Sequence, residues 1–129
     1  MVREWKPGIN HMEFWVSSFE KSLPFYEGLF SLIGWKKLND MAYSTGTIEI
    51  YFKEVNVNRQ RTVGPRHICF QAVDRKTVDL VSSYLKENEI EIIRGPIQRD
   101  EYSEGYYTVD FYDLDGYVLE VAYTPNMVL

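Results

Sequence analysis

Cysteine and histidine are scarce in this chain, and long apolar runs are missing. Cys69 is the single cysteine among 129 residues, which excludes an intramolecular disulfide. No apolar run approaches the roughly 20 residues that a transmembrane helix needs. The opening segment, MVREWKPGIN, has no apolar core of the kind that marks a secretory signal. We therefore expect a soluble, cytoplasmic protein without a membrane partner.

Basic residues are in the minority. The chain has 14 Lys and Arg against 19 Asp and Glu, for a net charge of −5, and its longest basic cluster is Lys36-Lys37. Such a surface offers little attraction to a phosphate backbone, so nucleic acid is not an expected partner. Hydrophobic residues make up 45% of the sequence, enough to build a core. The length suits one domain covering 1–129.

The first half of the chain has a recognisable order of elements. The segment INHMEFWV alternates apolar and polar residues as a strand does. A helix is predicted from a cap at Ser18 to an end at Gly34, because apolar residues recur there at helical spacing. Three short strands fit the segments WKKLN, MAYST and TIEIYFKE, with turn residues between them. The order is therefore βαβββ.

The second half repeats this order after a shift of 56 residues. His67 then falls on His11, and the helix cap Asp74 falls on Ser18. A helix, a strand at 90–94, a polar loop and strands YYTVDFY and YVLEVAY follow, the last two joined by the turn DLDG. The sequence thus predicts an α+β fold of two tandem βαβββ modules, at about 9–54 and 66–124.

Two histidines and two glutamates occupy matched places in this repeat. His11 and His67 begin the first strand of each module, and Glu49 and Glu120 interrupt an apolar run in the last strand. By strand parity all four lie on the face opposite the one that the helices need for packing. A lone His or Glu in a strand is usually a surface residue, but four in matched places favour a metal site. Nitrogen and oxygen donors suit one divalent ion, which leaves Zn, Ni, Co, Mn and Fe(II) open.

Strand parity also suggests which residues line the pocket around such a site. Four side chains share faces with the histidines and glutamates: Trp15, Tyr51, Cys69 and Gln71. Ordinary packing of a curved sheet is an equal alternative for each. We interpret Cys69 as a small buried hydrophobe rather than a nucleophile. The segment YSEGYY at 102–107 either closes over the pocket with Gly105 as its hinge or forms a plain surface loop.

Several segments together resemble a known superfamily. INHMEFWV, KSLPFYEGLF, TIEIYF, RHICFQ and DLDGYVLEVAY look like the vicinal oxygen chelate group, which includes glyoxalase I, bleomycin resistance proteins and extradiol dioxygenases. The resemblance extends from about Asn10 to Thr124. It implies a half-open barrel with helices on the convex side and a metal in its cleft. It also implies a small-molecule substrate and often a homodimer, whose two chains in some members share each site.

The His, Glu, His, Glu set resembles glyoxalase I in particular. That resemblance implies a metal-dependent lyase or isomerase that moves a proton on a substrate chelated through two vicinal oxygens. It also implies catalytic roles for Glu120 as the base and Glu49 as the second candidate. Trp15 and Lys53 stand where the glutathione-using enzymes have an arginine and an asparagine, which argues against glutathione as the thiol.

Two other functions fit the same resemblance. A bleomycin-resistance-like protein would bind a planar ligand without catalysis, with Trp15 and Tyr51 as stacking walls. An Fe(II) ring-cleaving dioxygenase would use His11, His67 and Glu120 alone. Fosfomycin-modifying transferases resemble the same three-ligand set. In both classes of enzyme Glu49 would not be a metal ligand.

Overall fold

The computed structural model describes residues 7–57 and 67–127. The first module contains β1 (His11–Val16), α1 (Phe19–Ile33), β2 (Lys36–Asn39), β3 (Ala42–Ser44) and β4 (Glu49–Glu54). The second contains β5 (Ile68–Gln71), α2 (Arg75–Glu87), β6 (Ile92–Gln98), β7 (Tyr107–Tyr112) and β8 (Val118–Tyr123). The predicted α+β fold of two tandem βαβββ modules is confirmed. The module bounds and the single domain stay predictions, and residue 66 lies outside the described residues.

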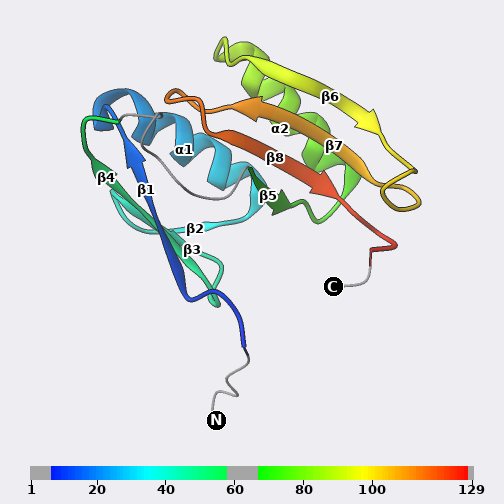
Figure 1. The fold of residues 1–129 in the computed structure, drawn as a ribbon, viewed down its shortest axis with the longest axis horizontal. Coiled ribbons are helices and arrows are strands. Elements are labelled where there is room, and N and C mark those ends of the chain that lie inside the picture. Colours follow the sequence, from blue (N-terminus) through cyan, green and yellow to red (C-terminus); the bar gives the residue numbers. More distant parts are fainter. Residues whose placement is uncertain (1–6, 58–66, 128–129) are drawn as a thin grey trace.

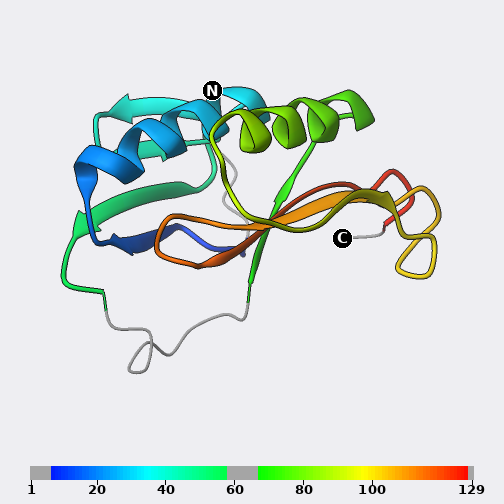
Figure 2. The same cartoon turned by 90° about the horizontal axis from the view of Figure 1, so that it is seen from above.

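Each module forms its own four-stranded sheet. The strand orders are β1-β4-β3-β2 and β5-β8-β7-β6, so the two sheets have the same topology. In each sheet the first and last strands of the module pair in parallel and the others pair antiparallel. Both helices contact each other and lie on the same side of the sheets (Figures 1 and 2). The opposite faces of both sheets are left without helices.

The helices begin and end where the sequence predicts. The Ser18 hydroxyl accepts a hydrogen bond from the Lys21 amide at the start of α1, and Gly34 ends this helix with a φ of 89°. Asp74 caps α2 by accepting from both the amide and the hydroxyl of Thr77, which lowers the pKa of the Asp74 carboxyl. Within the described part of the chain, no helix has the length and apolar character that a membrane span requires.

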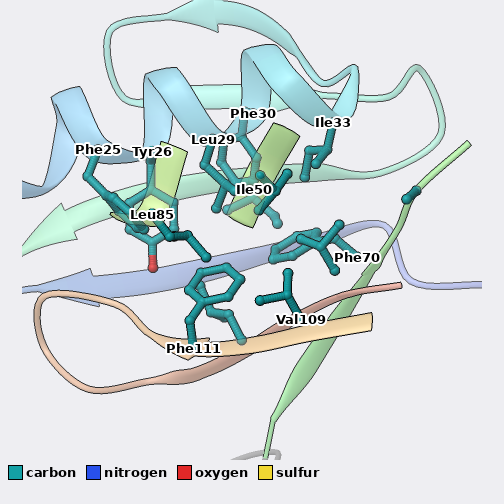
Figure 3. Packing of buried hydrophobic residues seen from close by; sticks show 14 of the residues in the cluster. Phe25, Tyr26, Leu29, Phe30, Ile33, Ile50, Phe70, Leu85, Val109 and Phe111 are labelled. Carbon is teal, nitrogen blue, oxygen red and sulfur yellow. The ribbon is translucent and has the colours of Figure 1, made fainter. Parts of the chain in front are cut away.

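One hydrophobic core joins the two modules. Phe30 of α1 lies with its ring centroid 5.6 Å from that of Phe70 in β5. Figure 3 shows α1 above the core, with Ile50 of the first sheet and Phe111 of the second pointing into the same space. Three residues at helical spacing form the apolar stripe of α2 and are completely buried: Val78, Val81 and Leu85.

β6 differs from the sequence prediction. The strand was expected at 90–94 with a loop after it, yet β6 continues to Gln98 through Gly95 and Pro96. The pairing register between β6 and β7 shifts on both sides of Arg94, which accommodates the extra residues of β6. Proline is tolerated in β6 because β6 is an edge strand. Gly95 adopts a φ of 99° in close contact with the Thr108 backbone of β7. A pattern of alternating residues does not reveal such an irregular edge strand.

Gly28 allows α1 and α2 to approach closely. A Cβ atom there would meet the Tyr84 side chain, with ring carbons at 2.6 and 2.8 Å, and the Tyr84 hydroxyl already donates to the Phe25 carbonyl at 2.8 Å. We expect Gly28→Ala to lower the free energy of unfolding by about 1–3 kcal/mol, as overpacking does, measured by urea denaturation. In a Tyr84→Ala background the same change should stabilise by about 0.5–1 kcal/mol, because only helix propensity remains. Equal effects in both backgrounds would contradict this explanation.

Candidate functional site

The uncovered face of each sheet carries the residues that the sequence singled out. In β1, the exposed His11, Glu13 and Trp15 alternate with the buried Phe14 and Val16. Trp15 remains 45% exposed. The prediction that the helices leave this face open is therefore confirmed for the first sheet.

The four predicted metal ligands form two separate pairs. His11 is the register partner of Glu49 across β1 and β4. In the other sheet, His67 Nε2 lies 3.4 Å from Glu120 Oε1. Among residues 7–57 and 67–127, no group of three or more His, Cys, Asp or Glu side chains is close enough to hold a metal ion. Within one chain, the two pairs therefore lie on different sheets.

The two glutamates are not in equivalent positions, although the histidines are. Glu120 pairs with Cys69 in the second sheet. The 56-residue shift places Cys69 on Glu13, and Glu13 pairs with Tyr51 rather than with Glu49. Tyr51 therefore occupies the place in the first module that Glu120 has in the second. Glu49 lies two residues away along the strand, a difference that the sequence repeat does not show.

Glu120 has a more enclosed environment than Glu49. It is only 5% exposed, whereas Glu49 is exposed. Glu120 Oε2 accepts hydrogen bonds from the Tyr106 hydroxyl at 2.6 Å and the Thr108 hydroxyl at 2.7 Å. Sequence reasoning did not single out Thr108, and it placed Tyr106 only within the segment 102–107 that could close over the pocket. Thr108 left a weak signal as a polar residue inside an apolar strand, whereas the contact of Tyr106 depends on the path of the loop before β7.

His11 is held in place by its neighbours. Its Nδ1 lies 2.8 Å from the Asn10 side-chain oxygen, and its ring stacks on Tyr51 with centroids 5.4 Å apart. The hydrogen bond at Nδ1 leaves Nε2 as the nitrogen available to a metal. The first sheet therefore presents an oriented imidazole on an open surface.

A row of polar side chains crosses the second sheet beside Glu120. Asp110 of β7 is the register partner of Glu120, and Arg94 of β6 is the partner of Asp110. Arg94 donates to Asp110 at 2.7 Å. Burial and the nearby Glu120 carboxylate nevertheless raise the pKa of Asp110. The ion pair keeps this second carboxylate engaged with Arg94.

The predicted pocket residues divide between the two sheets. Trp15 and Tyr51 lie on the first, and Cys69 and Gln71 line a groove of about 640 Å³ between the modules. Gln71 donates to the Ala72 and Ala122 carbonyls. Cys69 is exposed rather than buried as expected, but partial burial of its thiol and the Glu120 carboxylate raise its pKa to about 12. The thiol is therefore protonated at neutral pH, which agrees with its interpretation as a residue that is not a nucleophile.

Known proteins with similar sequences and folds cover nearly the whole chain. Metallothiol transferases FosB from Staphylococcus haemolyticus and Staphylococcus epidermidis are each 32% identical over 117 residues, which is 88% of this chain and 81% of theirs. A putative glyoxalase from Bacillus halodurans has a similar structure, with a TM-score of 0.72, 24% identity and coverage of 89% of this chain and 94% of that one. A glyoxalase/bleomycin resistance protein from Albidiferax ferrireducens T118 has a TM-score of 0.71 and 19% identity, with coverage of 89% and 98%. The model of the glyoxalase/bleomycin resistance protein/dioxygenase superfamily matches residues 8–121, and the chain belongs to this superfamily.

Proposed function

We propose that this protein is a metal-dependent thiol transferase. It would bind one divalent metal ion through His11, His67 and Glu120 and join a thiol to a small electrophilic substrate. The observation that carries the proposal is the paired His67 and Glu120, in which one carboxylate oxygen is hydrogen-bonded and the other faces the imidazole. The 32% identity to proteins named metallothiol transferases supports the reaction class.

The donor atoms of this pair fit a metal ion. Two donors about 2.1 Å from one ion at a tetrahedral angle are about 3.4 Å apart, which is the distance between His67 Nε2 and Glu120 Oε1. Imidazole nitrogen and carboxylate oxygen are ligands for Zn, Ni, Co, Mn and Fe(II), so the identity of the metal stays open. Glu49 is outside the proposed set because Tyr51 occupies the place equivalent to Glu120.

The third ligand would come from a second chain. His11 lies on the other sheet, and no cluster of three ligands forms within the described part of one chain. We propose a homodimer in which the open first sheet of one chain faces the second sheet of its partner. Each dimer then contains two sites, each with His11 from one chain and His67 and Glu120 from the other.

The reaction requires one bond to form and one to break. The thiol loses its proton to solvent, its sulfur bonds to an electrophilic carbon of an epoxide, the carbon–oxygen bond breaks, and the oxygen keeps the electron pair and takes up a proton from solvent. A bound metal ion would act as a Lewis acid on that oxygen. The protein's own contribution is to hold Glu120 in one orientation through Tyr106 and Thr108 and to keep Asp110 paired with Arg94.

Metal content and complementation between variants test this proposal. We expect about one metal per chain by elemental analysis of untagged protein, and loss of metal in both His11→Ala and His67→Ala. When the two variants are folded together in equal amounts, half of the dimers are mixed and each mixed dimer has one intact site. Thiol addition to fosfomycin, assayed with cysteine, glutathione and coenzyme A, should recover to about a quarter of the wild-type rate. Metal binding without recovery would place each site within one chain, and absence of metal would reject the proposal.

A glyoxalase I type reaction is a second candidate because Glu49 faces His11 directly across β1 and β4. No side chain among the described residues donates a hydrogen bond to the Glu49 carboxylate, so this residue is freer to move a proton than Glu120. If this candidate is correct, the wild-type protein should isomerise a hemithioacetal of methylglyoxal, and it should leave fosfomycin unchanged with each thiol.

A further inference from the structure

The carboxylate of Glu120 presents two chemically different oxygens. Oε2 accepts from the hydroxyls of Tyr106 and Thr108, at 2.6 and 2.7 Å, while Oε1 lies 3.4 Å from His67 Nε2. Thr108 Oγ1 has longer contacts to Asp110 and Val121, both at 3.3 Å, so its single proton is best placed on Glu120. An oxygen that already accepts two hydrogen bonds has little capacity left for a metal ion. Oε1 is therefore the oxygen that remains available.

The loop between β6 and β7 holds Tyr106 at this position. The Arg99 amide donates to the Tyr106 carbonyl at 2.7 Å, which closes the base of the loop. Inside the loop, the Gly105 amide donates to the Asp100 side chain at 2.9 Å, with Gly105 at a φ of 79°. The Asp100 side chain also accepts from Gln98, the last residue of β6. The residue before Tyr106 is thus tied to the strand that precedes the loop.

This network continues to α2. Arg75 Nη1 donates to Gln98 Oε1 at 2.9 Å, and the Arg75 guanidinium lies 3.7 Å above the Tyr107 ring centroid. Tyr107 in turn donates to Asp79 on the same helix. The loop is therefore connected at both of its ends to a packed helix, which limits how far the Tyr106 hydroxyl can move away from Glu120.

We propose that Tyr106 and Thr108 are positioning residues that make Glu120 a one-oxygen metal ligand, and that the loop anchored through Asp100 keeps Tyr106 in place. This inference rests on the proposed metal site. Because the two hydroxyls occupy Oε2, Glu120 binds through Oε1 alone and does not chelate with both oxygens. One coordination position is thereby left for substrate, and the same hydrogen bonds prevent Glu120 from leaving the metal as a mobile base.

Cobalt titration of four variants tests the proposal. We expect Tyr106→Phe and Thr108→Val each to weaken Co²⁺ binding by about 10–100-fold, the range found for partners of metal ligands. The visible absorption of bound Co²⁺ should also change in Tyr106→Phe, because Oε2 keeps only the Thr108 hydrogen bond and the orientation of Glu120 is less fixed. Thr108→Ser retains the hydroxyl and should bind Co²⁺ like the wild type. Tyr102→Phe is the matched control, since it removes from the same loop a hydroxyl that contacts Arg94 instead of Glu120.

Thermal unfolding of the metal-free variants separates positioning from a purely structural role. If the hydroxyls only satisfy a buried carboxylate, Tyr106→Phe and Thr108→Val will lower Tm but will bind Co²⁺ with wild-type affinity and spectrum, which overturns the proposal. Failure of the wild-type protein to bind Co²⁺ would overturn the proposed metal site together with it. Wild-type binding with unchanged variants would overturn the positioning role alone.

Discussion

Asp113→Ala is expected to lower the free energy of unfolding by about 3–5 kcal/mol, a large effect for one substitution. Asp113 is 5% exposed and begins the DLDG turn between β7 and β8. Its Oδ2 accepts from the Tyr26 hydroxyl at 2.6 Å, and its Oδ1 accepts from the amides of Asp115 and Tyr117 at 2.9 and 2.8 Å. Alanine would leave all three donors without this acceptor.

Asp113 stabilises the contact between the two modules, so its loss should weaken that contact. Tyr26 is fully buried on α1 of the first module, while the turn belongs to the second. Asp115 in the same turn accepts from the Ser17 amide of the first module at 2.9 Å. Both hydrogen bonds connect the turn to α1 and its start. Without Asp113, the buried hydroxyl of Tyr26 also loses its partner, which accounts for much of the expected cost.

Asp113→Asn is the matched control and carries a pH dependence. Burial raises the pKa of Asp113 above its ordinary value of 3.8, although its three hydrogen bonds act in the opposite direction. The folded protein therefore holds this proton more tightly than the unfolded chain. The corresponding stability is present below about pH 4 and is lost as the pH rises through the raised pKa. Asparagine keeps the shape and the Oδ1 acceptor of the two amides, replaces the Oδ2 that accepts from Tyr26 by an NH2 group, and does not titrate.

Urea denaturation between pH 3 and 7 measures both effects. The difference in the free energy of unfolding between the wild type and Asp113→Asn should favour the wild type more at pH 3 than at pH 7. Only the wild type has a carboxyl at this position that loses its proton, and the stability that goes with it, as the pH rises. At neutral pH Asp113→Asn should unfold at a urea concentration between those of the wild type and Asp113→Ala, because it keeps the acceptor of the two amides but not that of Tyr26. If the stability of the wild type relative to Asp113→Asn instead grows with pH, the hydrogen bonds have a larger effect on the pKa of Asp113 than burial has.

Local features of the sequence were sufficient to predict most elements of the fold. Ser18 and Gly34 bound α1 as expected because a side-chain acceptor and a residue that adopts positive φ act within one or two turns of the chain. Val78, Val81 and Leu85 are buried because helical spacing alone places them on one stripe. Such features depend on near neighbours, so one sequence reveals them.

The candidate site was predicted less completely because it depends on strand register and loop path. His11, His67 and Glu120 were selected as candidates from strand parity, but parity does not distinguish a strand position from one two residues away. Glu49 therefore seemed equivalent to Glu120, whereas Tyr51 holds the equivalent position. Tyr106 reaches Glu120 only through the path of its loop. Three and four protein ligands consequently predict different metal affinities for Glu49→Gln.

Paired glutamine substitutions should give the largest difference in function. We expect Glu120→Gln to weaken divalent metal binding by more than about 100-fold, which exceeds the effect of losing a residue that only hydrogen-bonds to a ligand. Thiol transfer should be lost together with the metal. Glutamine lacks the charge of a ligand oxygen, and its amide would disturb the acceptor position shared by Tyr106 and Thr108. Glu49→Gln should retain metal affinity and transfer within about threefold, because Glu49 is exposed and lies two residues from the equivalent position.

Calorimetric titration with Zn²⁺, together with product analysis after incubation with fosfomycin and each thiol, measures these effects. The two substitutions are isosteric and remove one charge each, so a general effect of net charge would appear equally in both. A strong loss in both variants would indicate a four-ligand site and favour the glyoxalase I type reaction. A strong loss in Glu49→Gln alone would reject the three-ligand assignment, because the hydrogen bonds that hold Glu120 would then serve a residue that the metal does not need.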